Sequence, residues 1–227
     1  KAAEYGIVLT EEDTKAIADA AAAFLADNDE NTKEQMTADQ ATIERVLTLM
    51  TIRSKVAAAV KAEAEVVVTD EEAAQRGFSY VSMSKLDDAG EELSAEDLQA
   101  AKDKLAAITA SVESGNTMDA AAVENGMTSY PGTYGEGTDV YYDAALIDAL
   151  NAVKEGEVTD VVETEKELYL AVVTAEVDEE ATASRKETLE ASAKTDYFNN
   201  TLAVWVEEYP LTINESVWEQ VVFDRSY

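Results

Sequence analysis

Apolar residues recur at helical spacing over much of the chain, and several of these runs begin beside a residue that can cap a helix. At the first of them, Thr10 is followed three positions later by Asp13, which is the spacing of a capping box. Ile17, Phe24 and Leu25 then fall on one helical face. The residues that begin predicted helices in this way are Thr10, Thr37, Thr69, Ser94 and Thr117.

Strand patterns interrupt these helices in the middle of the chain. The stretch Gly77–Ser84 alternates and contains β-forming residues, which predicts a strand. Val158–Glu163 and Leu168–Thr174 predict two more strands, joined by a short charged turn. Before these two strands, the glycine- and tyrosine-rich residues 128–142 are expected to form a loop and Ala144–Val153 a helix.

The flanks of this middle region are helical. Residues 175–209 predict one long charged helix with a broken apolar stripe, and the tail after Pro210 is expected to be extended. Neither flank has enough apolar surface for a core of its own, so we expect the two to pack against each other. The predicted fold class is α+β, with an N-terminal helical segment 1–75, an inserted α+β unit 76–176, and a C-terminal helix and tail 177–227.

The charge of the chain limits its partners. The formal net charge is −31, from 48 acidic and 17 basic residues. Nucleic acid is not expected as a partner, because phosphate binding needs clustered Lys and Arg. The charge indicates either a solvated surface that resists aggregation or a salt-adapted or cation-binding surface.

One acidic stretch begins like a calcium-binding loop, with the pattern Asp27-x-Asp29-x-Asn31. It has Thr32 where such a loop needs glycine and Ala38 where it needs glutamate. We therefore predict an ordinary acidic loop here and no metal site in the protein.

Two residue types are missing from the chain. Without cysteine there can be no disulfide, thiol nucleophile or zinc–thiolate site. Without histidine the chain lacks the usual acid or base of neutral pH and every histidine-containing catalytic triad. No apolar run approaches the ~20 residues that span a bilayer. We expect no cofactor.

Four stretches of the middle unit follow one another in an order that can be compared with known domains. They are the strand FSYVSM, the helix before VENGMT, the loop GTYG, and LIDALNAVKEGEVTDVVETEKELYLAVV. Together they resemble the parvulin-type (rotamase) peptidyl-prolyl isomerase domain. With the flanks LTEEDTKAIADAAAAFL and VVVTDEEAAQ, the whole chain resembles exported foldases of the PrsA/SurA type. The resemblance implies a parvulin-like small antiparallel sheet with surrounding helices, inserted between helical segments that pack as one chaperone domain.

The resemblance also implies where functional residues lie. Active parvulins usually have one histidine in the first strand and one in the closing strand, and this chain has Tyr80 and Tyr169 there. The family's acidic or thiol residue falls near Asn125–Met127, where neither is present. The residues that correspond to substrate-binding positions are Met127, Tyr134, Tyr142 and Leu146.

Three roles stay open for Tyr80 and Tyr169. Their hydroxyls could take part in catalysis by donating or accepting hydrogen bonds, they could bind a peptide, or they could be core residues with exposed hydroxyls. Isomerisation needs no nucleophile. It needs a rotational barrier of ~18–20 kcal/mol to be lowered, mostly by binding the twisted amide better than the planar one.

The sequence therefore predicts an extracytoplasmic foldase or chaperone that binds unfolded or proline-containing segments, with weak or lost isomerase activity. The alternative is an active peptidyl-prolyl isomerase with a tyrosine-lined site. A purely structural surface protein would be expected to show repeats or low-complexity segments, and this chain has neither.

The resemblance further implies exported polypeptide clients and a place at the cell surface as a lipid-anchored protein. The chain starts at Lys1 without an initiator methionine, which we interpret as removal of an N-terminal lipoprotein segment. Whether the protein forms a homodimer is left open.

Overall fold

The structure is a computed structural model that describes residues 1–87, 89–210 and 212–220. Contacts divide the chain into two compact units. One consists of Lys1–Val66 and the residues from Ala191 onward, and the other of Val67–Glu190. The division into 1–75, 76–176 and 177–227 stays a prediction. No helix in the described ranges is long and apolar enough to cross a membrane.

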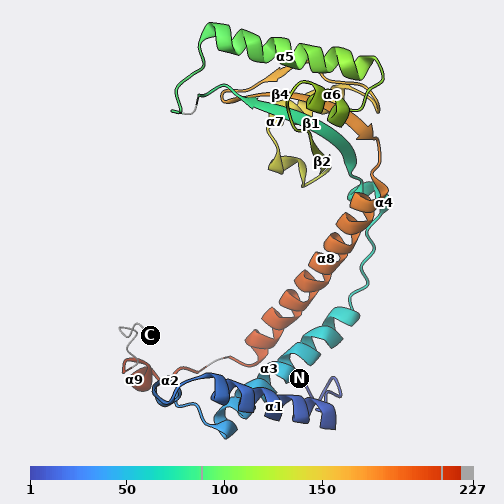
Figure 1. Ribbon diagram of the computed structural model, residues 1–227. Helices are drawn as coiled ribbons and strands as arrows, with labels where there is room; N and C mark the ends of the chain where they lie inside the picture. The colour runs from blue at the N-terminus through green and yellow to red at the C-terminus, as the bar shows by residue number, and fades with distance from the viewer. Residues whose placement is uncertain (88, 211, 221–227) are drawn as a thin grey trace. The chain divides into compact units, whose positions relative to one another are not determined.

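The first unit is helical (Figure 1). Its helices are α1 (Glu11–Asp27), α2 (Glu30–Gln35), α3 (Gln40–Ala62), the second part of α8 (Glu179–Glu208) and α9 (Glu215–Trp218). The predicted capping box is present at the N-terminus of α1. The Thr10 hydroxyl accepts from the Asp13 backbone N–H, and the Asp13 carboxylate accepts from the Thr10 backbone N–H.

Three expectations for this unit are corrected. The cap of α3 is Asp39 and not Thr37, which has a left-handed φ of 52°. The acidic stretch predicted as a loop contains α2, which Asp29 caps. The tail contains the short helix α9, while residues 211 and 221–227 lie outside the described ranges.

The core of the first unit is small. Among the described residues its buried apolar side chains are Ile17, Ala21, Val56 and Val60, from α1 and α3. The second part of α8 contacts this unit mainly through polar and aromatic groups. Lys61 donates to the Thr195 hydroxyl over 3.0 Å, the rings of Tyr5 and Trp205 meet edge to face at 5.8 Å, and Lys1 forms an ion pair with Glu208 over 3.1 Å.

The second unit is built on a four-stranded antiparallel sheet, in agreement with the predicted α+β class. Its strands, in the order β2-β1-β4-β3, are β2 (Tyr130–Tyr134), β1 (Arg76–Ser84), β4 (Glu167–Ala175) and β3 (Val162–Glu163). The first strand and the closing strand are confirmed. The prediction of a loop over residues 128–142 is wrong where β2 forms. Strand β3 is shorter than the predicted strand Val158–Glu163, because Val158 makes only an isolated bridge to Val172.

Successive side chains of each strand point to opposite faces of the sheet, and helices pack on both faces. Helices α5 (Ala95–Glu113) and α6 (Met118–Glu124) cover one face, over a cluster that includes Val81 and Leu170 (Figure 1). Helix α7 (Ala144–Ala152) packs on the other face, over Phe78 and Val173. The unit also contains α4 (Asp70–Ala73), the 3-10 turn η1 (Asp139–Tyr141) and the first part of α8.

Candidate functional site

Aromatic rings gather around Phe78 on the sheet face that α7 partly covers. Phe78 is only 1% exposed. Its ring centroid lies 5.6 Å from that of Tyr80, 5.7 Å from that of Tyr134 and 5.0 Å from that of Tyr142. The latter two are edge-to-face contacts, a favoured arrangement of aromatic pairs. Phe78 therefore forms the buried centre of a tyrosine-rich surface.

Strand pairing brings Tyr80 and Tyr169 together. Tyr80 pairs with Ala171 and Ser82 with Tyr169 across β1 and β4, so the two tyrosines are diagonal neighbours on the same face. Their ring centroids are 6.3 Å apart. The two positions singled out from the sequence thus belong to one site.

Tyr130 is a member of the site that the sequence analysis missed. It lies opposite Tyr80 in the pairing of β2 with β1, and the two ring centroids are 5.8 Å apart. The signal was the alternation Tyr130–Gly132–Tyr134, which would place both tyrosines on one face of a strand. We call Tyr80, Tyr130, Tyr142 and Tyr169, with the buried Phe78 between them, the tyrosine face.

The tyrosine face is partly open to solvent. Tyr130 is 50% exposed, and Tyr80, Tyr142 and Tyr169 are partly buried. Between residues 67 and 190 no described group hydrogen-bonds to any of these four hydroxyls, and none of them is a buried unpaired atom, so the hydroxyls reach solvent. They are available to hydrogen-bond an incoming ligand.

The hydroxyls of Tyr80 and Tyr169 can serve as neutral hydrogen-bond donors. Burial raises the pKa of Tyr80, and the neighbouring rings of Tyr142 and Tyr130 add to the rise. Burial likewise raises the pKa of Tyr169, with further contributions from the negative charges of Glu167 and Asp143. Both phenols therefore stay protonated at neutral pH, where they can donate a hydrogen bond and cannot act as strong bases.

Tyr134 and Leu146 support the site from below. They are 3% and 1% exposed, and both belong to the cluster under the tyrosine face. Tyr134, Tyr142 and Leu146, which the resemblance assigned to substrate binding, are thus brought together around Phe78. Tyr142 is the one of the three that solvent reaches.

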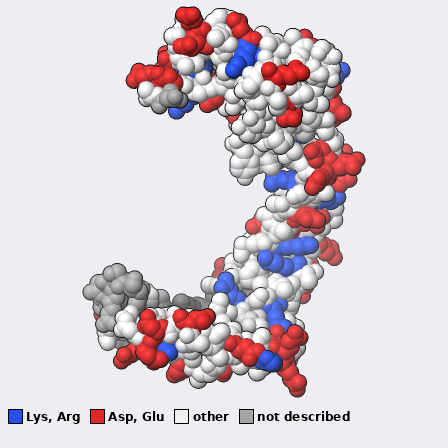
Figure 2. Space-filling view, in the orientation of Figure 1, with Lys and Arg blue, Asp and Glu red and all other residues white. Residues whose placement is uncertain are grey.

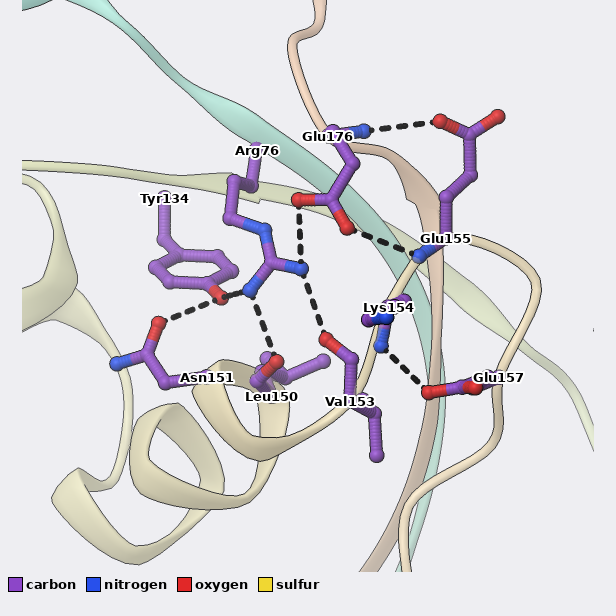
Figure 3. Close-up of polar contacts among 9 residues, drawn as sticks. All are labelled: Arg76, Tyr134, Leu150, Asn151, Val153, Lys154, Glu155, Glu157 and Glu176. Atoms are coloured by element: carbon purple, nitrogen blue, oxygen red, sulfur yellow. Dashed lines mark hydrogen bonds and ion pairs between the residues drawn. The ribbon is translucent and has the colours of Figure 1, made fainter.

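A partly buried hydrogen-bond network around Arg76 holds Tyr134 in place (Figure 3). Arg76 donates to the Tyr134 hydroxyl over 2.8 Å, and that hydroxyl donates to Asn151 Oδ1 over 3.0 Å. Arg76 also donates to the carbonyls of Leu150 and Val153, both over 2.9 Å, at the C-terminal end of α7. Burial raises the pKa of Tyr134 although Arg76 opposes the rise.

The charge of Arg76 is balanced by Glu176, whose carboxylate is 3.0 Å away. A positive group at the end of α7 also interacts favourably with the helix dipole. No sequence motif pointed to Arg76, whose partners lie about 58 to 100 positions further along the chain.

Met127 does not join the tyrosine face. It packs against the cluster on the opposite side of the sheet, with the residues under α5 and α6. The neighbouring Asn125 donates to the Ala121 carbonyl over 2.9 Å and ends α6. The segment near 125–127 therefore lies with the other core cluster.

The described residues contain no group of three or more acidic side chains arranged to hold a metal ion. Acidic side chains are more frequent than basic ones over the visible surface of the second unit (Figure 2). The chemistry that the tyrosine face can offer is aromatic contact and hydrogen bonding by neutral hydroxyls.

Comparison with known proteins gives matches to solved structures alone. No protein-family model matches the sequence, and no curated protein matches it. A peptidylprolyl isomerase (PrsA) of Bacillus cereus is 14% identical, with 91% of this chain and 77% of that chain covered and a TM-score of 0.38. The foldase protein PrsA of Streptococcus pneumoniae is 15% identical, with 88% and 77% covered and a TM-score of 0.37.

A further match is a SurA-like chaperone of Campylobacter jejuni, 10% identical, with 90% of this chain and 79% of that chain covered and a TM-score of 0.31. The structural neighbours of this chain are thus isomerases and chaperones of the PrsA and SurA type.

Proposed function

We propose that this protein is a foldase-type chaperone that binds extended polypeptide segments on the tyrosine face, with weak or no peptidyl-prolyl isomerase activity. The observation that carries the proposal is the set of partly exposed tyrosines around Phe78, whose hydroxyls have no partner among the described residues. Tyrosine rings offer flat apolar contact to proline or aromatic side chains, and their hydroxyls offer hydrogen bonds to a peptide backbone.

The chemistry of the face supports the proposal of weak isomerase activity. Donation from Tyr80 or Tyr169 to a twisted amide would stabilise the transition state only if the donor were held in place and water excluded. Neither hydroxyl has a second group that orients it among the described residues, and Tyr130 is 50% exposed at the edge. Peptide binding makes a smaller demand on geometry than lowering the rotational barrier does.

An active isomerase is the second candidate. One observation favours it: the rings of Tyr80 and Tyr169 lie 6.3 Å apart on neighbouring strands, and both phenols have a raised pKa. Two neutral donors at one site could hydrogen-bond a strained amide.

We further propose basic, proline-containing or aromatic clients that are exported polypeptides, and an extracytoplasmic location. Support for the location and for lipid anchoring comes from the sequence resemblance. The preference for basic clients rests on the net charge of −31, which repels acidic segments.

A peptide array tests the proposed function. Full-length wild type is compared with Tyr130→Ala/Tyr142→Ala, which removes two solvent-accessible rings, and with Tyr197→Ala, a 41% exposed tyrosine of the other unit, as control. We expect the double variant to lose binding of proline- and aromatic-containing peptides about tenfold, because each stacking contact contributes ~0.5–1.5 kcal/mol. The control should bind as wild type does. Unchanged binding by the double variant would contradict the proposal.

A further inference from the structure

Two adjoining hollows lie beside the turn that contains Gly156, near the end of α5. The first has a volume of about 440 Å³, and its apolar lining includes Val112, Met118 and Val172. The second has a volume of about 350 Å³ and shares Val112 and Gly156 with the first. Val112, Met118 and Val172 belong to the cluster under α5 and α6, which lies across the sheet from the tyrosine face. We call the two hollows the Gly156 groove.

Carboxylates surround the apolar floor of this groove. Those in its lining are Glu113, Asp119, Glu155 and Glu157. Neither hollow is lined by Lys or Arg. Within the part of the chain that the structure describes, none of the four carboxylates forms an ion pair. Their negative charges are therefore not neutralised by the protein.

Three of these carboxylates are held by neutral donors. Glu155 accepts from the Glu176 backbone N–H over 3.2 Å, and Glu157 accepts from the Lys154 backbone N–H over 2.8 Å (Figure 3). Asp119 accepts from the Ser129 hydroxyl over 3.2 Å. These bonds fix the positions of the acidic groups and leave their charge for a ligand.

We propose that the Gly156 groove is a second polypeptide-binding site, which takes an extended segment with an apolar side chain flanked by Lys or Arg. The aliphatic stem of a Lys or Arg can lie on the valines of the floor while its charged end reaches the carboxylates. Because none of the four carboxylates has a cationic partner in the protein, a ligand cation beside them is favoured. Two adjoining hollows that share Val112 and Gly156 suit two side chains of one extended chain.

Charge and lining distinguish this site from others. Anionic membrane surfaces and nucleic acids are repelled by the rim, which makes them unsuitable occupants. The lining contains no aromatic residue, in contrast to the tyrosine face. The inference therefore stands apart from the proposed function, and either site can fail without the other.

The test measures how tightly the full chain binds a fluorescein-labelled hexapeptide at low salt. In this peptide Lys alternates with Leu or Val. The groove variant is Glu113→Gln/Asp119→Asn/Glu155→Gln/Glu157→Gln, which keeps side-chain size. The control variant changes the net charge equally at four exposed carboxylates outside the groove that form no ion pair, namely Glu91→Gln/Glu96→Gln/Asp160→Asn/Glu165→Gln. Circular dichroism checks that both variants are folded.

We expect the Kd of the groove variant to rise about tenfold, from the loss of several weak charge contacts, and that of the control variant to change by about twofold or less. Methyl resonances of Val112, Val158 and Val172 should shift when the peptide is added to wild type. Equal loss in the two variants, no binding by wild type, or shifts confined to the tyrosine face would each overturn the inference. Retained binding by Tyr130→Ala/Tyr142→Ala separates this site from the proposed function.

Discussion

Gly132 of β2 lies directly against the ring of Phe78 on β1. A Cβ atom at position 132 would stand 2.5 Å from Phe78 Cζ and 2.7 Å from Cε1. The two residues are partners in the pairing of the strands. The missing side chain lets the Phe78 ring extend over the edge strand, where it contacts Tyr80, Tyr134 and Tyr142. The tyrosine face depends on this close approach.

The first prediction concerns Gly132→Ala. The added methyl overlaps the Phe78 ring, and overpacking of this kind costs about 1–3 kcal/mol of unfolding free energy. Denaturant unfolding measures the loss. In a double-mutant cycle, Phe78→Leu should reduce the cost of Gly132→Ala, because the smaller side chain leaves room for the methyl. Additive costs for the two substitutions would show that the clash is not the cause.

The second prediction concerns the arginine network. Arg76→Lys removes the guanidinium group, which donates simultaneously to Tyr134, Leu150 and Val153. We therefore expect a loss of about 2–4 kcal/mol in the free energy of unfolding. Asn151→Ala removes one acceptor from an exposed position and should cost less than about 1 kcal/mol. Thermal unfolding compares the two. Similar stability of both variants would contradict the central role of Arg76.

The third prediction concerns catalysis. NMR measures the exchange between the cis and trans forms of an Xaa-Pro peptide, which takes about tens to hundreds of seconds without a catalyst. We expect this exchange to be only slightly faster when the full chain is present. Tyr80→Phe and Tyr169→Phe should change that rate little. Any residual rate should be constant between about pH 6 and 9, because the chain lacks histidine and burial raises the pKa of both phenols. A large rate enhancement lost in either variant would establish the alternative function.

The fourth prediction concerns pH and the first helix. Hydrogen bonds from Thr10 and the nearby ammonium of Lys55 lower the pKa of Asp13 from 3.8 to about 2. A pKa lowered by folding stabilises the protein above the unfolded pKa, and that contribution disappears as the pH falls from about 4 to about 2. Asp13→Asn should therefore lower Tm at pH 7, with a difference from wild type that shrinks toward pH 2.

Asp27→Asn serves as the control for this measurement. Asp27 is the last residue of α1, where a negative charge is unfavourable to the helix dipole, so its replacement should not lower Tm at pH 7. A difference between wild type and Asp13→Asn that stays constant from pH 7 to pH 2 would contradict the assignment.

Much of the fold could be predicted because its signals are local. Thr10, Thr69, Ser94 and Thr117 cap helices through a hydrogen bond to a backbone N–H three residues away, so a short stretch of sequence contains the whole interaction. The prediction failed at Thr37, where Asp39 two residues later offers a better cap. Strand alternation likewise predicted β1 and the closing strand β4.

Part of the site was also predictable. The resemblance selected Tyr80, Tyr169, Tyr134, Tyr142 and Leu146, and all five lie in or beside the cluster around Phe78. Met127 was assigned to the same site from sequence but packs on the opposite face of the sheet. Met127 follows α6 in a short loop without alternation, so the local pattern gives no information about which face of the sheet its side chain reaches.

By itself the sequence determined the α+β class, the starts of α1, α4, α5 and α6, and the two inner strands, because periodicity and capping act within a few residues. The tertiary structure decided that Tyr130–Tyr134 is a strand, since its glycine and proline weaken the signal of the alternating tyrosines and pairing with β1 supplies the hydrogen bonds. The register of β1 with β4 places Tyr80 beside Tyr169, and packing around α5 and the Gly156 turn forms the acidic groove. These features depend on contacts between residues far apart in the chain, which local patterns do not encode.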